Sequence, residues 1–174
     1  AEPRKYGFHA TLKAPFRLAG GQGEDDLADA VDRLAGQLRP LWLEGLALTR
    51  IGPFLALTPE GDQTALNAFA ARVVEMMDPF RAPLTDAEIA RRNPARLTHR
   101  QRELLDLWGY PYVFEEFQFH MTLTGALDPA MLDRAGAALQ PYLAVMPRPF
   151  TLDAISLMGE TQDGRVRLIR RVPL

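Results

Sequence analysis

Apolar and polar positions repeat with two different periods along the first half of the chain, and each period predicts one type of element. Alternation or short apolar runs, which are typical of strands, occur at residues 6–13, 41–50 and 53–59. Residues 23–38 and 64–77 carry apolar side chains at every third or fourth position, as an amphipathic helix does. We therefore expect a strand, a helix, a hairpin that turns at Gly52 and Pro53, and a second helix.

Between the two halves of the chain, residues 81–109 predict two short helices. Each begins at a threonine, Thr85 or Thr98, that is followed three positions later by a glutamate or a glutamine. This spacing is the capping box, in which the two side chains satisfy backbone N–H groups at the start of a helix. Gly109 suits the C-terminal end of the second helix.

The second half of the chain repeats the order of the first half. Residues 112–125 predict a long strand, and residues 128–143 predict a helix that begins at Asp128 and Pro129. Residues 150–174 predict a hairpin that turns at the sequence TQDG. Strand, helix and hairpin thus occur twice.

This recurrence predicts an α+β fold with two pseudo-symmetric lobes of antiparallel sheet and helices around a central cleft. We expect a single two-lobed domain, with lobe one at about residues 6–80, a helical connector at about 81–109 and lobe two at about 110–174. The chain starts with Ala1 and reaches its first motif almost at once. We therefore also expect that the N-terminal part of lobe one is missing.

One short motif lies on the first predicted strand of each lobe. The sequences FHATL at residues 8–12 and FHMTL at residues 119–123 contain two of the three histidines of the chain. Because side chains alternate faces along a strand, each histidine shares its face with the threonine two positions later. Symmetric lobes would bring four side chains to one cleft: His9, Thr11, His120 and Thr122.

Two imidazoles and two hydroxyls suit the cleavage of a phosphodiester. Histidine titrates near pH ~6.5, so one imidazole can take a proton from the attacking water while the other gives one to the leaving oxygen. The threonine hydroxyls can donate hydrogen bonds to the non-bridging phosphate oxygens, where charge changes most. Lys13 and Thr124, on the same strand faces, and Tyr6 are weaker candidates for substrate binding. Which histidine is the acid stays open.

The paired motifs resemble those of the two-histidine (2H) phosphoesterase superfamily, which includes LigT-like RNA ligases and 2',3'-cyclic phosphodiesterases. The longer sequences YGFHATLKAPF and WGYPYVFEEFQFHMTLTG are most similar to a branch linked to bacterial phosphonate metabolism. The resemblance covers nearly the whole chain. It implies a LigT-like fold and a metal-independent cyclic phosphodiesterase, a hydrolase without a cofactor. It matches both His-x-Thr motifs to the catalytic positions of the superfamily.

Composition narrows the partners and the compartment. The chain has 174 residues, of which 47% are hydrophobic and 24% charged, and no apolar run is long enough for a membrane span. A net charge of -2 gives no global attraction to nucleic acid or acidic lipid, so an anionic substrate must be held locally. The absence of cysteine excludes disulfides and thiolate metal sites. We expect a cytoplasmic protein that binds a small phosphorylated substrate, which is a nucleotide, a sugar phosphate or an RNA terminus, with no obligate protein partner.

Two alternative functions stay open. The same cleft could bind a phosphorylated ligand or RNA terminus without turnover. The arginines of residues 91–102 could steer such a ligand into the cleft, or they could form a solvated helical face. A metal-dependent hydrolase is the other, because Glu115 and Glu116 precede His120, and only Glu116 would share the face of that histidine on a strand. The sequence has no Gly-rich phosphate loop, since GGQG at residues 20–23 follows no nucleotide-binding pattern.

Overall fold

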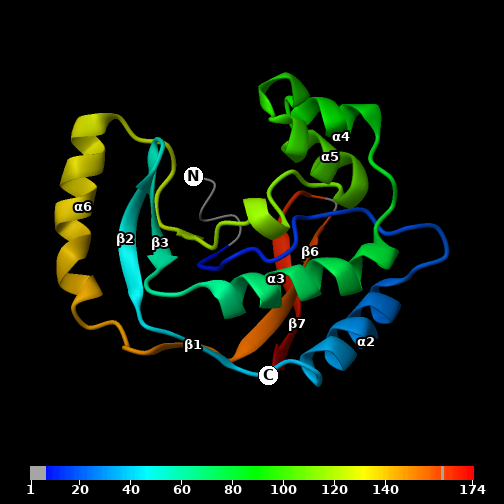
Figure 1. Ribbon diagram of the computed structural model, residues 1–174, viewed down its shortest axis with the longest axis horizontal. Helices are drawn as coiled ribbons and strands as arrows, with labels where there is room; N and C mark the ends of the chain where they lie inside the picture. Colours follow the sequence, from blue (N-terminus) through cyan, green and yellow to red (C-terminus); the bar gives the residue numbers. More distant parts are fainter. Residues whose placement is uncertain (1–6, 162) are drawn as a thin grey trace. The chain divides into compact units, whose positions relative to one another are not determined.

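The computed structural model describes residues 7–161 and 163–174, so Tyr6 lies outside the described residues. The structure mixes helices with antiparallel sheets (Figure 1). The chain forms two compact units and passes between them four times. Unit 1 consists of the residues up to Thr11, Arg39–Gln63 and Phe119–Leu174, and unit 2 consists of Leu12–Leu38 and Thr64–Gln118. This grouping differs from the lobes expected in sequence order, and the symmetry of those lobes stays a prediction.

Unit 1 contains the strands. β2 (Leu46–Ile51) and β3 (Phe54–Pro59) form the first predicted hairpin, and the short β4 (Met121–Thr122) pairs with the other edge of β3. β6 (Ala154–Glu160) and β7 (Val166–Pro173) form the second predicted hairpin. All of these pairings are antiparallel, as expected.

Two stretches that we expected to be single strands are each divided. β1 (Leu41–Leu43) precedes β2, β5 (Phe150–Leu152) precedes β6, and β1 pairs with β5. Gly45, between β1 and β2, lies so close to the Glu60 carboxylate and the Arg148 guanidinium that a Cβ would clash with both. The two halves of the chain are therefore joined by a strand pair that local patterning does not reveal.

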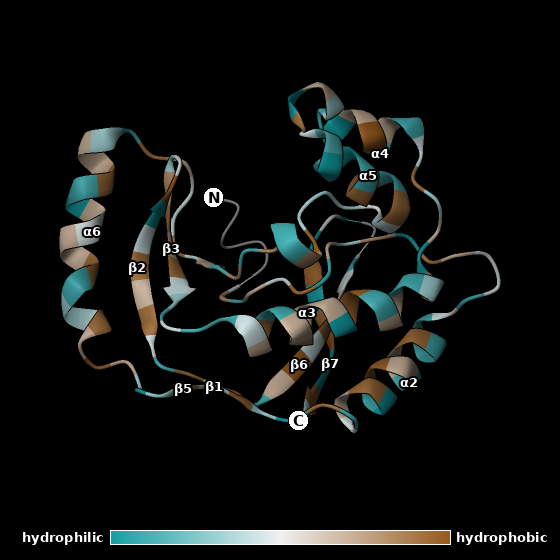
Figure 2. Cartoon of the chain, viewed as in Figure 1, coloured by the Kyte–Doolittle hydropathy of each residue, from teal (hydrophilic) through white to brown (hydrophobic). Residues whose placement is uncertain are grey.

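Unit 2 contains four helices at the predicted places: α2 (Glu24–Ala35), α3 (Thr64–Met77), α4 (Asp86–Arg91) and α5 (His99–Trp108). α3 buries the six residues expected from its period: Leu66, Phe69, Ala70, Val73, Val74 and Met77. α2 contacts α3, and Figure 2 shows polar and apolar residues alternating around α2. Within the described part of the chain, every helix is too short or too polar to span a lipid bilayer.

The two helices of the connector begin as predicted, and the second also ends as predicted. Thr85 and Thr98 each accept a hydrogen bond from the backbone N–H three residues later, and both capping boxes are complete. Gly109 ends α5 with φ +74°. This left-handed conformation is one that glycine adopts without the strain of a Cβ atom.

The prediction of a strand at residues 6–13, for the first motif, is wrong. In its described part only Ala10 pairs, through an isolated bridge. Gly7 has φ +71°, which interrupts an extended backbone on one side of this bridge. On the other side, the Lys13 ammonium is bound by Asp78 in unit 2, and the chain leaves the sheet.

The prediction of a long strand at residues 112–125, for the second motif, is also wrong. In this range only β4 is a strand. Phe114 has φ +53° and starts a 3-10 turn, η3 (Phe114–Glu116). Glu115 in this turn forms an ion pair with Arg100 of α5. This contact with α5 stabilises the turn, and residues 114–116 therefore do not form an extended strand.

Candidate functional site

The two His-x-Thr motifs meet at one backbone bridge within unit 1. Their central residues, Ala10 and Met121, form an antiparallel bridge. If this register continues by one residue in each direction, the histidine of each motif lies opposite the threonine of the other. The two expected pairs are His9 with Thr122, and His120 with Thr11. Residues directly opposite in an antiparallel pair have Cβ atoms about 4.5–5.5 Å apart, so the register predicts that these side chains are neighbours.

The sheet that contains β4 has two different faces. Leu48, Leu57 and Met121 are neighbours across the three strands and share one face. Helix α6 (Pro129–Leu143) contacts β2 and β3, and its Gly136 lies against Leu48, so α6 covers this apolar face (Figure 1). Because side chains alternate, the histidines and threonines of the motifs lie on the face opposite α6.

His9 is exposed, and its ring is oriented by a local contact. Its Nδ1 lies 3.1 Å from the carbonyl oxygen of Gly7. Because a carbonyl oxygen can only accept, Nδ1 carries the proton and donates it, and neutral His9 has its lone pair on Nε2. This tautomer suits proton exchange through Nε2.

The left-handed backbone of Gly7 places that carbonyl, and we expect Gly7→Ala to disturb it. A Cβ at Gly7 would meet no atom within 4 Å, so the cost comes from φ +71° alone, about 1–2 kcal/mol. Urea unfolding should show this loss of stability, and the Hε1 resonance of His9 should move. Gly20→Ala is the matched control, because Gly20 also has open space but no positive φ. Equal stability of the two variants would contradict the expectation.

His120 is half-buried, and its ring packs against Phe54. The ring centroids are 6.2 Å apart with an interplanar angle of 46°. Phe54 was not predicted from the sequence, because no motif marks it and only the tertiary structure brings it near the histidine. The hydroxyl of Thr124, a predicted substrate ligand, accepts a hydrogen bond from the backbone N–H of Leu55 at 3.0 Å. Thr124 thus connects the segment after β4 to β3.

Lys13, the other predicted substrate ligand that the structure describes, belongs to unit 2. Its ammonium donates to Asp78 at 2.9 Å and to the Val74 carbonyl at 3.3 Å, and the side chain is only 8% exposed. Burial lowers the pKa of Lys13, while the hydrogen bond and charge of Asp78 act in the opposite direction. Arg81 also binds Asp78, through two hydrogen bonds of 2.8 and 3.2 Å.

The carboxylates considered for a metal site are engaged elsewhere. Glu116 lies in η3, where its carboxylate accepts a hydrogen bond of 2.9 Å from the Gln101 amide. It therefore does not share a strand face with His120, and that expectation is wrong. Among the described residues, no group of three or more histidine, aspartate or glutamate side chains is placed to hold a metal ion.

The arginines of residues 91–102 differ in their surroundings. Arg100 binds Glu103 as well as Glu115, and Arg102 donates to the carbonyl of Leu97. The Arg92 guanidinium lies over the ring of Tyr110, 4.8 Å from its centroid. Three of the five arginines in this stretch therefore contact other groups of the protein itself.

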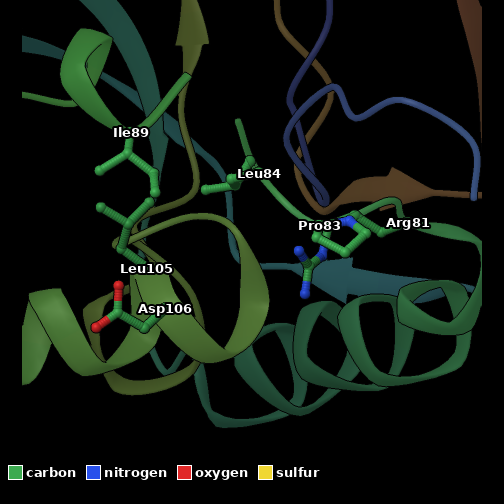
Figure 3. A pocket seen from close by; sticks show the side chains of 6 residues that line it. All are labelled: Arg81, Pro83, Leu84, Ile89, Leu105 and Asp106. Carbon is green, nitrogen blue, oxygen red and sulfur yellow. The ribbon is translucent and has the colours of Figure 1, made fainter. Parts of the chain in front are cut away.

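A cavity of about 370 Å³ lies within unit 2 (Figure 3). Six residues line it: Arg81, Pro83, Leu84, Ile89, Leu105 and Asp106. Figure 3 shows Ile89 and Leu105 next to each other on one side and Arg81 beside Pro83 on the other. The guanidinium of Arg81 is bound by Asp78 and by the carbonyl of Leu107 at 2.9 Å. Four of the six lining residues are apolar and two are charged, and none of them is a predicted site residue.

Comparison with known proteins gives one family and two similar relatives. Residues 11–166 match a family described as "Protein of unknown function (DUF1045)". A protein of Janthinobacterium sp. (strain Marseille) is 40% identical over 169 residues, which are 94% of this chain and 37% of that protein. A protein of Laribacter hongkongensis (strain HLHK9) is 37% identical over 162 residues, 86% of this chain and 37% of that protein.

Both relatives are named ribose 1,5-bisphosphate phosphokinase PhnN. This chain spans only 37% of the length of each, so the name describes proteins that are much longer. The family model, in contrast, covers most of the chain. This protein therefore belongs to the DUF1045 family.

Proposed function

We propose that this chain is a phosphoesterase of the 2H superfamily, with a LigT-like pseudo-symmetric fold, that opens a cyclic phosphodiester. The observation that carries the proposal is the bridge between Ala10 and Met121. Continued by one residue on each side, its register would bring the histidine of each motif opposite the threonine of the other, on the sheet face away from α6. In this arrangement, two imidazoles that can transfer protons and two threonine hydroxyls that can donate hydrogen bonds would surround one phosphate.

In the proposed reaction, water attacks the phosphorus atom and the bond from phosphorus to one ring oxygen breaks. One imidazole takes a proton from the water, and the other, protonated, gives its proton to the leaving oxygen. On His9 the exchanging atom is Nε2, because Nδ1 donates to Gly7. The products are a phosphomonoester and a free hydroxyl.

The hydroxyls of Thr11 and Thr122 are proposed to bind the non-bridging oxygens. Negative charge grows on these oxygens as the fifth bond to phosphorus forms, so a fixed donor stabilises the transition state more than the substrate. Both proton transfers are supplied by the imidazoles. The chemistry therefore has no step that depends on a metal ion.

The names of the relatives suggest a substrate. A cyclic phosphate that joins O1 and O2 of ribose 5-phosphate would give ribose 1,5-bisphosphate when its bond to O2 is broken. That product is the compound in the relatives' name. We therefore propose a cyclic phosphate of a pentose phosphate as the substrate class, which would also fit a role in phosphonate metabolism.

Phosphorylation itself is not proposed for this chain. A kinase must bind the phosphates of its nucleotide, and this sequence has no Gly-rich phosphate loop. The segment that matches this chain is 37% of each relative. We propose that the named kinase activity belongs to the remainder of those proteins.

The proposal is tested by incubating the protein with 2',3'-cyclic nucleotides and with cyclic phosphates of ribose 5-phosphate, in excess EDTA. We expect a phosphomonoester from at least one compound, and ³¹P NMR identifies which ester bond was broken. Turnover that EDTA abolishes would support the metal-dependent alternative. Tight binding without product at any pH would support a non-catalytic binding module for a phosphorylated ligand.

A further inference from the structure

Phe54 and His120 are in contact although they lie on different strands and 66 positions separate 54 from 120 in the numbering. Phe54 is the first residue of β3, directly after the turn of the β2–β3 hairpin. Both side chains are partly buried, so neither ring is simply surrounded by solvent. The contact is therefore a candidate for holding the imidazole in one orientation.

The backbone around Phe54 is held by a cluster of hydrogen bonds at its neighbour Leu55. The Leu55 carbonyl accepts from the N–H groups of Leu123 and Thr124, at 2.9 and 3.3 Å. The Leu55 N–H donates to the Thr124 hydroxyl at 3.0 Å. These three bonds fasten the start of β3 to the segment that follows β4, so Phe54 has a well-defined position.

His120 immediately precedes β4, whose ladder with β3 covers Met121 and Thr122. An imidazole can rotate about its Cα–Cβ bond to the extent that neighbouring groups allow it. The Phe54 ring, 6.2 Å away between centroids and tilted by 46°, is a rigid neighbour of this kind.

We propose that Phe54 is a positioning residue that fixes the orientation of the His120 imidazole. Its effect on catalysis rests on the proposed phosphoesterase function, but the contact itself can be tested without a substrate. Catalytic groups act well only when other side chains hold them close to the productive geometry. A small rotation of His120 would carry its nitrogens away from the phosphate.

The contact is tested by ¹H NMR of the imidazole Hε1 signals at pH ~9, where an ordinary imidazole is neutral. The three histidines give three signals, which single His→Gln variants assign. An aromatic ring shifts the signal of a proton held near it, so we expect the His120 signal to move in Phe54→Leu. The signals of His9 and His99 should stay in place, and Phe54→Tyr, which keeps the ring, should leave the His120 signal close to its wild-type position.

Kinetics test the catalytic consequence. We expect Phe54→Leu to lower kcat about 10-fold with little change in KM, and Phe54→Tyr to restore kcat. Phe150→Leu is the matched control, because Phe150 is also partly buried in a strand of unit 1, but in β5. It should lower stability without changing kcat.

The outcomes separate this proposal from the proposed function. A His120 signal that does not move in Phe54→Leu would overturn the proposal, whatever the activity. A signal that moves while kcat stays at the wild-type value would show that the orientation has no catalytic importance. A wild-type protein without phosphoesterase activity would overturn the proposed function, and the NMR result alone would then decide whether Phe54 orients His120.

Discussion

Alanine at His9 or at His120 is expected to lower kcat/KM for a cyclic phosphate at least ~100-fold in each single variant. The reason is that each imidazole is proposed to transfer a proton in the same chemical step. The kcat/KM of the double variant should be only slightly lower than that of the less active single variant. The effects of removing groups that act together in one transition state are not additive. Steady-state rates with the substrate identified in EDTA provide the measurement.

The third histidine supplies the control for this experiment. The His99 side chain is 85% exposed on α5, 3.5 Å from Glu103, and it is far from both motifs in the sequence. His99→Ala should keep the wild-type rate. If both motif variants also kept it, the shared sheet face would not be a catalytic site, and binding without turnover would become the better account.

The second large effect concerns stability and is expected at Asp78. Its carboxylate accepts one hydrogen bond from Lys13 and two from Arg81, whose side chains are 8% and 12% exposed. Asp78→Ala would leave two largely buried cations without their shared partner, and such a loss costs about 3–5 kcal/mol. Urea unfolding at neutral pH measures this change.

Two further variants make the result specific. Lys13→Met should cost less, about 1 kcal/mol, because Asp78 keeps Arg81 and the methionine replaces the buried stem of the lysine. Arg17→Ala removes an exposed ion pair with Glu88, which solvent screens, and should cost much less than Asp78→Ala. If Asp78→Ala were as stable as Arg17→Ala, the cluster would not hold unit 2 together.

Lys13→Met also tests the substrate role that the sequence predicts for Lys13. If the lysine only supports unit 2, KM should stay at its wild-type value while stability falls. A large rise in KM without a loss of stability would instead support a contact between Lys13 and the phosphate. The hydrogen bonds of its ammonium to Asp78 and Val74 favour the first result.

The pKa values of this cluster predict how its contribution depends on pH. Burial acts to raise the pKa of Asp78, but hydrogen bonds from Arg81 and Lys13 outweigh it, and the pKa is lowered. The Asp78 contribution is therefore complete above the carboxyl's ordinary value of 3.8 and is lost as the pH falls through the lowered folded value. Wild type and Asp78→Ala should accordingly differ less in strong acid than at neutral pH.

The pKa values of Asp78 and Lys13 point in different directions about the strength of their ion pair. The lowered pKa of Asp78 indicates a favourable pair, whereas the lowered pKa of Lys13 indicates that burial of the ammonium outweighs it. We give more weight to Asp78, because three hydrogen bonds converge on it and Lys13 is only one of its two partners. This is why the larger effect is expected for Asp78→Ala.

The sequence alone determined the elements whose causes are local. The bounds and buried face of α3 follow from a helical period within 14 residues. The capping boxes at Thr85 and Thr98 and the left-handed Gly109 depend on residues at most four positions away. The β2–β3 hairpin needs only two strand-forming runs and a turn. In each case, one short segment contains all the interacting groups.

The recurring His-x-Thr motif was also evident from sequence, but its surroundings were not. Neither motif lies on a long strand, because Gly7 and Phe114 adopt left-handed backbone conformations and residues distant in sequence bind the flanking segments. No periodicity could show that Lys13 would be bound by Asp78 or that Phe54 would contact His120.

Only the tertiary structure decided which side chains became neighbours at the site. The bridge between Ala10 and Met121 joins residues 111 positions apart in the sequence, and its register, if continued, sets each histidine opposite the other motif's threonine. A shift of one residue would turn one motif to the opposite face. That register depends on the pairing of β4 with β3 and on the packing of α6 against β2 and β3, which are properties of the folded chain and of no single segment.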